Sequence, residues 1–422
     1  MTSVKLKNIV VCCDGTGQKL DVARSNVVRL FAALNRSNPD RQIAHYDPGV
    51  GTMPAAAALT PVSRRLTLWA GLMGGFGVLD NVADAYGFIV DRYVPGDRIY
   101  LLGFSRGALT VRLIGGLLHR IGVLRPDARN LIPYALELYG KHLTHIPDEG
   151  ERRQVRAVSE EFRQVFSAAG PVQIRFLGVW DTVKAFGVFR PKSFPHLRHN
   201  PSIQMVRHAI ALDERRRSYM FTSWGGLRDF VEAGPPPGQD VKEVWFAGDH
   251  SDVGGGHPEH ESGLSWRAFR WMVGEAGLAR LEFSDGQLAE TLRAALESSQ
   301  AHEDERFFRR HDLRTLGWRL LDLVPRRELV NAPARSSHAG MRLQEDLPVP
   351  LGWPNLTFTV WPITGHRHPK AYRRDGPLLL HWSVRPLVEA GQYVLDDVSY
   401  VEDAPLPSPD QAAGSRGPNT GR

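Results

Sequence analysis

Residues 97–110 read DRIYLLGFSRGALT, a strand-like run that passes through a glycine-flanked turn into a helix-like run. Its first half combines β-branched, aromatic and leucine side chains, which is typical of a buried strand. Its second half begins a series of apolar residues that recur at helical spacing from Leu109 to Leu118. The stretch therefore predicts a strand, a sharp turn at Ser105 and an amphipathic helix.

The turn itself has the pattern Gly-x-Ser-x-Gly, from Gly103 to Gly107. Between a strand and a helix this pattern is typical of a nucleophile elbow, in which a strained backbone presents the serine at the edge of a sheet. The two glycines let neighbouring backbone pack closely on both sides. We therefore predict Ser105 to be a nucleophile, with a simple helix cap as the alternative.

Strand-like and helix-like segments alternate through the first two-thirds of the chain. The predicted strands cover residues 8–13, 43–46, 97–102, 172–180 and 241–246, and the predicted helices 26–34, 81–93, 109–118 and 207–215. Such alternation favours an α/β fold of the α/β-hydrolase type, with a mostly parallel central sheet, helices on both faces and helical insertions. Further helices are predicted near 288–296 and 315–323.

The domain organisation follows from these patterns and from the composition. We predict an α/β-hydrolase core over residues 1–285, with a charged helical insertion near 130–168. A helical and loop-rich extension over 286–403 is expected to pack on this core. The polar, proline-containing tail 404–422 is expected to be disordered.

Reactive side chains follow several of the predicted strands. Asp181 comes after Gly-Val-Trp at the end of one strand, and His250 follows Gly-Asp at the end of another. Because the carboxyl ends of parallel strands meet at one edge, Ser105, Asp181 and His250 are expected to converge. The histidine would take the serine proton, and the carboxylate would orient the imidazole. Their chain order, nucleophile, acid, histidine, is that of α/β-hydrolases.

Supporting positions surround this predicted triad. The oxyanion of the tetrahedral intermediate needs backbone N–H donors, and these are predicted at Arg106 and in the first loop at Gly15 and Thr16. Asp14 is expected to shape that loop, and Asp252 to support the turn around the histidine. Together with the glycines of the elbow, these residues complete the predicted site.

Two other readings stay open at this stage. Asp249, His250 and Asp252, with His257 and His260 nearby, could form a carboxylate–imidazole cage together with Asp14 and Asp181. The chain would then be a metal-dependent phosphoesterase, whereas the triad needs neither a metal nor a cofactor. The other reading is a catalytically idle scaffold that binds a partner. His257, His260 and His381 compete with His250 for the role of base.

Charge and composition limit the classes of molecule that the chain is expected to bind. The 422 residues carry a formal charge of +6, but the basic residues are scattered among acidic ones, which argues against nucleic acid. Mild attraction to an anionic membrane surface is allowed. The adjacent Cys12 and Cys13 are expected to be buried thiols in a reducing compartment. No signal-peptide pattern is visible, so we expect a cytoplasmic protein, unless a dedicated machine exports it.

Six ordered motifs resemble one known family. They lie at residues 13–16, 46–52, 93–108, 178–183, 207–215 and 250–256. The chain is similar over about residues 8–275 to the α/β-hydrolase domain of the first class of type VI secretion lipase effectors, long catalogued as an uncharacterised conserved domain. The resemblance implies a hydrolase of lipid or phospholipid esters, with Ser105, Asp181 and His250 as nucleophile, acid and base. It also implies an immunity protein or the secretion machinery as partner.

Overall fold

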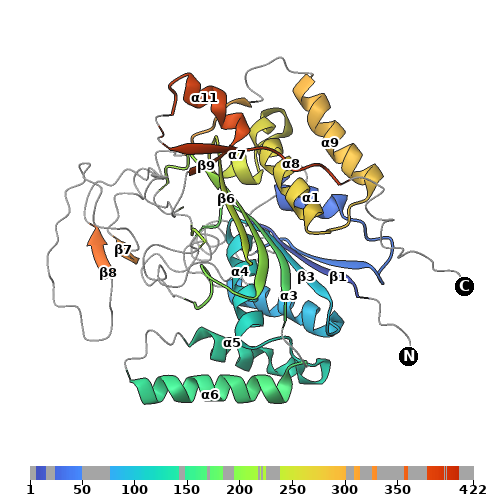
Figure 1. The fold of residues 1–422 in the computed structure, drawn as a ribbon, viewed down its shortest axis with the longest axis vertical. Coiled ribbons are helices and arrows are strands. Elements are labelled where there is room, and N and C mark those ends of the chain that lie inside the picture. The colour runs from blue at the N-terminus through green and yellow to red at the C-terminus, as the bar shows by residue number, and fades with distance from the viewer. Residues whose placement is uncertain are drawn as a thin grey trace, which may run out of the picture.

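The computed structural model describes residues 6–15, 24–49, 77–141, 148–168, 172–183, 194–216, 219, 222–224, 238–300, 308–313, 326–329, 356–359, 378–393, 395 and 397–407. Within them, the site edge of the sheet, both of its faces and the helices that cover them are defined (Figure 1).

A central sheet of eight strands organises the fold, in the order β10-β9-β6-β5-β4-β3-β1-β2. Every pairing between neighbours in it is parallel. The strands are β1 (Asn8–Cys13), β2 (Gln42–Asp47), β3 (Arg98–Phe104), β4 (Ile174–Trp180), β5 (Ile203–Ala211), β6 (Asp240–Phe246), β9 (Leu378–His381) and β10 (Val398–Val401). A separate antiparallel pair consists of β7 (Arg326–Leu329) and β8 (Leu356–Thr359). The predicted parallel α/β architecture is confirmed.

Helices lie on both faces of this sheet (Figure 1). They are α1 (Asn26–Ala33), α3 (Val78–Arg92), α4 (Arg106–Arg120), α5 (Ile132–Gly140), α6 (Glu149–Phe166), α7 (His250–Gly254), α8 (Gly263–Leu278), α9 (Asp285–Gln300) and α11 (Arg385–Glu389). Short 3₁₀ turns are η1 (Pro126–Leu131), η4 (Glu259–Glu261) and η7 (Trp382–Val384). The predicted helical insertion near 130–168 corresponds to η1, α5 and α6.

Strand β1 shows why both faces need cover. Its alternate residues Ile9 and Val11 belong to a buried core with α3 and α4, whereas Val10 and Cys12 belong to a second core with α1 and α8. Side chains alternate between the two faces of a strand, so an unbroken apolar run requires a hydrophobic layer on each side. Cys12 and Cys13 are buried free thiols, as expected.

One predicted element is wrong. Residues 207–215 were expected to form a helix, but residues up to Ala211 belong to strand β5, which pairs with β4 and β6. The charged Arg207 interrupts the apolar pattern that would have identified a central strand. Its guanidinium is 1% exposed and pairs with Glu275 and Asp240, so two carboxylates compensate its charge. A buried polar network, which is tertiary in origin, permits this strand.

The region after residue 285 contributes more than an attached extension. Strands β9 and β10 lengthen the central sheet beyond β6. Residues 404–407 of the predicted tail run along α8, where Ala404 lies against Gly274 and Pro407 against Gly277. The predicted helix 315–323 and the tail 408–422 fall outside the described residues. The division of the chain at residue 285 stays a prediction.

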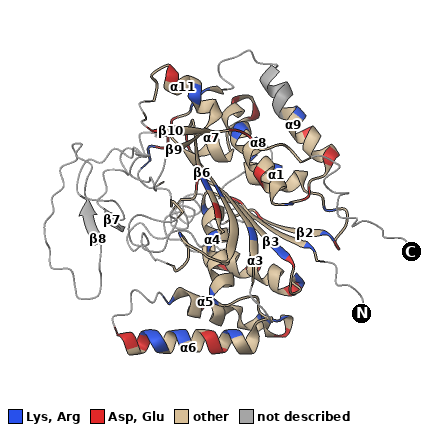
Figure 2. Cartoon of the chain, viewed as in Figure 1, with Lys and Arg blue, Asp and Glu red and all other residues tan. Residues whose placement is uncertain are grey.

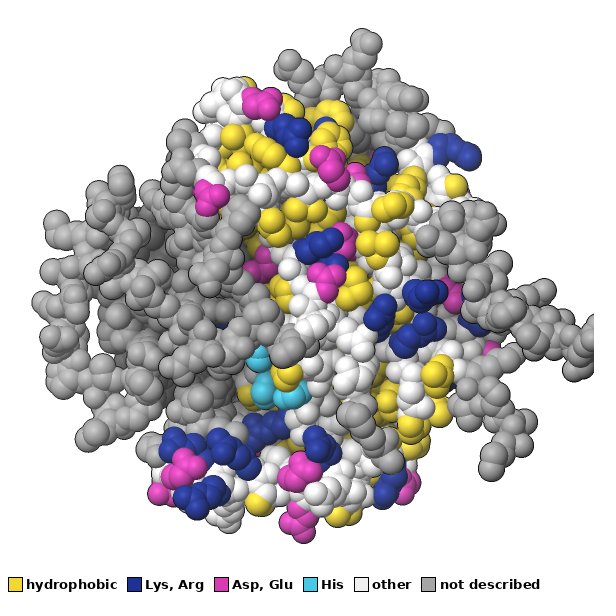
Figure 3. Space-filling view, in the orientation of Figure 1, with side chains coloured by type: hydrophobic (Ala, Val, Ile, Leu, Met, Phe, Trp, Pro, Cys, Tyr) yellow, Lys and Arg dark blue, Asp and Glu magenta, His cyan; other side chains and the backbone are white. Residues whose placement is uncertain are grey.

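Charged side chains are mixed in sign along the described surface. Helix α6 carries several Glu–Arg pairs at helical spacing, and Figure 2 shows both signs alternating along it. On the face drawn in Figure 3, basic side chains form separate groups with acidic ones among them. Among the described residues, no helix is long and apolar enough to cross a bilayer.

Candidate active site

The turn between β3 and α4 places Ser105 in a strained conformation. Its φ is +57° and its ψ is −119°, a region that non-glycine residues rarely adopt. A Cβ atom on Gly103 would lie 2.5 Å from the Gly107 carbonyl oxygen, and one on Gly107 would lie 2.0 Å from the Cys13 carbonyl oxygen. Both glycines are therefore required by close backbone approach, as the predicted elbow demands.

Three predicted residues meet at the carboxyl edge of the sheet. His250 Nε2 lies 2.8 Å from Ser105 Oγ, and His250 Nδ1 lies 2.6 Å from Asp181 Oδ2. Asp181 is fully buried, and Ser105 and His250 are 8% and 4% exposed. The structure therefore brings the three side chains into one hydrogen-bonded row, whose central imidazole contacts a hydroxyl on one side and a carboxylate on the other.

His250 occupies the first position of the short helix α7. The Asp249 side chain caps this helix by accepting from the backbone N–H groups of Ser251 and Asp252, and the Asp252 carboxylate accepts in return from Asp249 N. This capping box fixes the direction in which the helix starts. The rings of Phe104 and His250 pack 4.6 Å apart. The predicted supporting role of Asp252 thus corresponds to a defined contact.

Asp181 directly follows strand β4, and its carboxylate is held by a backbone N–H of strand β5. Its φ is +39°, and its Oδ1 accepts a hydrogen bond from Ala211 N at 3.0 Å, which leaves Oδ2 for the imidazole. The next residue, Thr182, donates its N–H to His208 Nε2 at 3.3 Å, and His208 Nδ1 lies 2.9 Å from Glu243. Burial lowers the pKa of His208, which favours the neutral ring that this acceptor role requires.

The predicted oxyanion donors differ in whether their backbone N–H already has an acceptor within the protein. Arg106 begins α4, so its N–H is among the first four of the helix, which have no intrahelical acceptor. The N–H of Gly15 instead donates to Asp14 Oδ1 at 2.7 Å. Thr16 lies outside the described residues. Of the predicted donors in the described chain, Arg106 is thus the one without an internal acceptor.

Asp14 shapes the first loop. Its Oδ2 accepts from the hydroxyl of Ser25 and, at 2.9 Å, from that of Tyr46. Burial raises the pKa of Asp14 to about 6, although these hydrogen bonds oppose the shift. Asp14 therefore links β1, β2 and α1 behind the site, and it has no contact with His250 in the described structure.

Sequence reasoning missed a buried group that supports His250 from the segment after β5. Glu214 accepts from His250 N at 3.4 Å and forms two hydrogen bonds with the Arg216 guanidinium. The Arg216 guanidinium carbon lies 3.6 Å from the centroid of the Tyr219 ring. This ring packs against the imidazole in an edge-to-face arrangement, with ring centroids 5.0 Å apart. The run of charged residues at 213–217 was the available signal. Such a run is common on an exposed helix face, but here it directly follows strand β5, at the edge of the sheet where the site lies.

The structure does not bring together the ligands that the metal-cage hypothesis requires. Asp252 and His257 do lie together, with His311 as third member, but neither Asp14 nor Asp181 belongs to this described group. Asp181 instead pairs with His250. Of the competing histidines, His260 is largely exposed and His381 pairs with Asp403.

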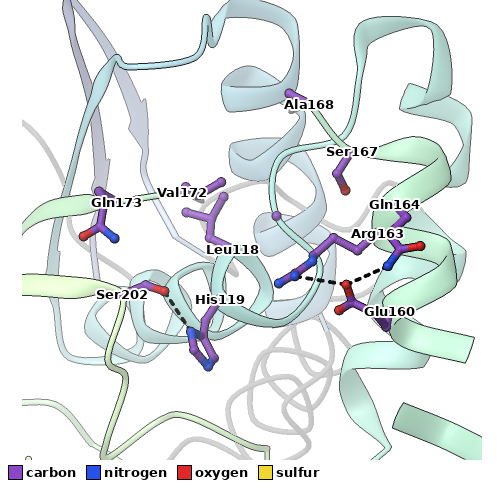
Figure 4. Close-up of a pocket in the computed structure, with 11 residues that line it drawn as sticks. Leu118, His119, Glu160, Arg163, Gln164, Ser167, Ala168, Val172, Gln173 and Ser202 are labelled. Atoms are coloured by element: carbon purple, nitrogen blue, oxygen red, sulfur yellow. Dashed lines mark hydrogen bonds and ion pairs between the residues drawn. The ribbon is translucent and has the colours of Figure 1, made fainter. Parts of the chain in front are cut away.

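A cavity of about 550 Å³ lies elsewhere (Figure 4). It is lined by the end of α4, by α6 and by residues that precede β4 and β5. Its polar groups pair with one another: His119 with Ser202, and Glu160 with both Arg163 and Gln164. Since α4 begins beside Ser105, its 15 residues put roughly 20 Å between this cavity and the site.

The fold and the hydrogen-bonded row define an α/β protein with a buried serine, histidine and aspartate at the strand ends. The chain belongs to the family described as type VI secretion system, phospholipase effector Tle1-like, catalytic domain, whose model matches residues 7–275. This membership supports hydrolase activity of the lipase or esterase kind.

Individual relatives are longer than this chain. An uncharacterized protein of Saccharomyces cerevisiae, YEL023C, is 32% identical over 219 residues, which is 50% of this chain and 32% of that protein. A crystal structure of an uncharacterized Pseudomonas aeruginosa protein is 19% identical, with a TM-score of 0.40 over 70% of this chain and 51% of that one. A Tle1 effector bound to the VgrG spike is 17% identical, with a TM-score of 0.30 over 61% and 52%. The chain thus spans about a third to a half of these proteins.

Proposed function

We propose that this chain is a serine hydrolase that cleaves carboxylic esters through an acyl-enzyme, with Ser105 as nucleophile, His250 as base and Asp181 as the orienting acid. The observation that carries the proposal is the contact of one imidazole with both the serine hydroxyl and the buried carboxylate. A serine hydroxyl needs such a base, because it is a weak nucleophile at neutral pH.

The reaction proceeds in two steps, acylation of Ser105 and hydrolysis of the acyl-enzyme. Ser105 Oγ attacks the ester carbonyl carbon while His250 Nε2 takes the hydroxyl proton, and the Asp181 carboxylate stabilises the imidazolium. The alcohol then leaves with that proton, and Ser105 stays acylated. In the second step, water attacks the acyl carbon while His250 Nε2 takes its proton. The bond between the acyl carbon and Ser105 Oγ then breaks, His250 returns the proton to Oγ, and the carboxylic acid leaves. The Arg106 N–H supports the oxyanion, and Thr16 is proposed to supply the second donor, because the Gly15 N–H is bonded to Asp14.

We propose phospholipids as the substrate class. The family description supports this, and so does the side chain that follows the nucleophile. Burial lowers the pKa of Arg106 to about 10, which still leaves its guanidinium charged at neutral pH. A cation within one residue of the nucleophile suits an ester that carries a phosphate. The secretion machinery is the proposed class of partner.

A fluorophosphonate probe tests the chemistry on the full chain. It is expected to label the wild type at Ser105 and to leave Ser105→Ala unlabelled. Turnover of short-chain esters should fall on the order of 10⁶-fold in that variant if the three residues act as a unit. Unchanged circular dichroism would show that Ser105→Ala is folded. Persistent turnover in a folded Ser105→Ala chain, or no labelling of the wild type, would overturn the proposal.

A further inference from the structure

A second group of side chains that could bind a metal ion includes one residue of α7. This cluster consists of Asp252, His257 and His311, whose ligand atoms all lie within 4.8 Å of one another. Asp252 Oδ1 is 2.7 Å from His311 Nδ1 and 3.7 Å from His257 Nε2. The two imidazole rings are stacked, with centroids 3.8 Å apart. The three residues come from α7, from the loop after it and from residues 308–313, so the fold alone brings them together.

We propose that this cluster binds a divalent transition-metal ion of the zinc class. Two imidazole nitrogens and one carboxylate oxygen are a ligand set that zinc commonly takes, with water in the remaining position. Metal–ligand bonds near 2.1 Å at tetrahedral angles put neighbouring ligand atoms about 3.4 Å apart. The 2.7 Å pair would open and the 3.7 Å pair would close by less than an ångström, which side-chain rotation can supply.

Two buried carboxylates lie beside the ligand atoms of the cluster. Asp249 and Asp252 are both 1% exposed, and they lie one helical turn apart with their carboxylates against His257. Asp249 Oδ2 is buried and has no hydrogen-bond partner among the described residues, while its Oδ1 lies 3.3 Å from His257 Nε2. An unpartnered buried carboxylate oxygen is costly in free energy. A metal ion at His257 Nε2 would lie beside this carboxylate and compensate its charge.

The outer contacts orient His311 as a ligand. Its Nε2 lies 3.1 Å from Glu261 Oε2, so a proton on Nε2 is held by that carboxylate. The lone pair of a neutral ring is then on Nδ1, the atom that faces Asp252. A carboxylate that holds the far N–H of a ligand histidine is the usual outer partner in metal sites.

The metal would have a structural role and would take no part in the ester reaction. Asp252 Oδ2 accepts from Asp249 N and from His311 N, so the cluster joins residues 308–313 to the first turn of α7. That turn carries His250. Neither Ser105 nor Asp181 is a member, and the inference does not depend on the proposed hydrolase activity.

Metal retention by the full chain tests the proposal. Protein stripped with EDTA, loaded with Zn²⁺ and desalted is expected to keep one zinc ion per chain, as measured by elemental analysis. Zn²⁺ should also raise the melting temperature, because it binds the folded state. His257→Gln and His311→Gln are expected to lose the zinc. His119→Ala, which removes a partly buried histidine near the end of α4, should retain it and serves as the matched control.

The outer partner gives a graded readout. Glu261→Gln keeps a side chain of the same size, and it should weaken zinc binding about 10- to 100-fold in a competition titration with a chelator. If either His→Gln variant fails to fold, this titration and the Co²⁺ absorption spectrum of the wild type decide the question. Failure of the folded wild type to retain Zn²⁺, Co²⁺ or Mn²⁺ would overturn the proposal, as would full retention by His257→Gln and His311→Gln.

Discussion

His250 Nε2 lies 2.8 Å from Ser105 Oγ, although 145 residues separate the two along the chain. The serine is presented by the strained turn after β3, and the histidine by the capped first turn of α7. Ser105 has a positive φ, whereas His250 is the first residue of a helix that Asp249 caps. The two side chains meet because both turns lie at the same edge of the sheet.

The role of Asp181 is tested by Asp181→Asn. The amide oxygen can still accept from Ala211 N, which turns the NH₂ group towards His250 Nδ1. The imidazole would then carry its proton on Nε2, facing the serine, and could not act as base. We expect ester turnover to fall on the order of 10⁴-fold with little change in stability. The exposed Asp285→Asn is the control, and similar turnover in both variants would contradict the orienting role.

Arg106→Leu separates the side chain from the backbone N–H, which the variant keeps. We expect kcat/KM for an anionic phospholipid to fall about 10- to 100-fold, the loss of one charged hydrogen bond. Turnover of a neutral short-chain ester should change little. Arg293→Leu on α9 is the matched surface control. An equal loss on both substrates would instead mean that the Leu side chain disturbs the elbow.

The buried Glu214–Arg216 pair is predicted to matter for stability as well as for the position of His250. Glu214→Ala leaves the Arg216 guanidinium buried without its bidentate partner and should lower the free energy of unfolding by about 3–5 kcal/mol. Urea denaturation measures this. The double variant Glu214→Ala/Arg216→Met should recover part of the loss, because the uncompensated charge is gone. The single variant Arg216→Met completes the comparison. If the double variant lost the sum of the two single losses, the coupling between Glu214 and Arg216 would be refuted.

Asp14 should make stability depend on pH in a defined direction. Its pKa is raised from 3.8 to about 6 by burial, so the folded state holds a proton that the unfolded state has released between these values. The free energy of unfolding therefore falls as pH rises from 4 to 6, by about 2 kcal/mol from this group. Asp14→Asn cannot titrate. Urea midpoints of both proteins at pH 4 to 7 should thus shift in favour of the variant as pH rises, and a constant difference would contradict the shifted pKa.

Gly107 is predicted to tolerate no side chain. A Cβ atom there would lie 2.0 Å from the Cys13 carbonyl oxygen, which belongs to the neighbouring strand and cannot move alone. Gly107→Ala should cost about 3 kcal/mol or more, or abolish the fold. Gly286→Ala is the control, because its Cβ would meet nothing within 4 Å in helix α9, and it should change stability by less than about 1 kcal/mol. Thermal denaturation compares the two.

Much of the architecture could be predicted from local pattern. The apolar runs of β1 and β3, the helical spacing in α4 and the elbow between them are short-range signals, and each corresponds to an observed element. Strand β5 could not be predicted in this way. Its buried Arg207 is stable only because Glu275 on α8 and Asp240 on β6 neutralise it, and no local pattern shows which distant carboxylates will be near.

Sequence alone therefore determined the strand, turn and helix around Ser105 and the candidate residues Ser105, Asp181 and His250, because residue chemistry and short-range apolar spacing are local properties. Tertiary structure decided which groups touch. It joined Glu214 to His250 and brought His311 beside Asp252. The physical reason is that hydrogen bonding and desolvation act over a few ångströms in space, whatever the separation along the chain.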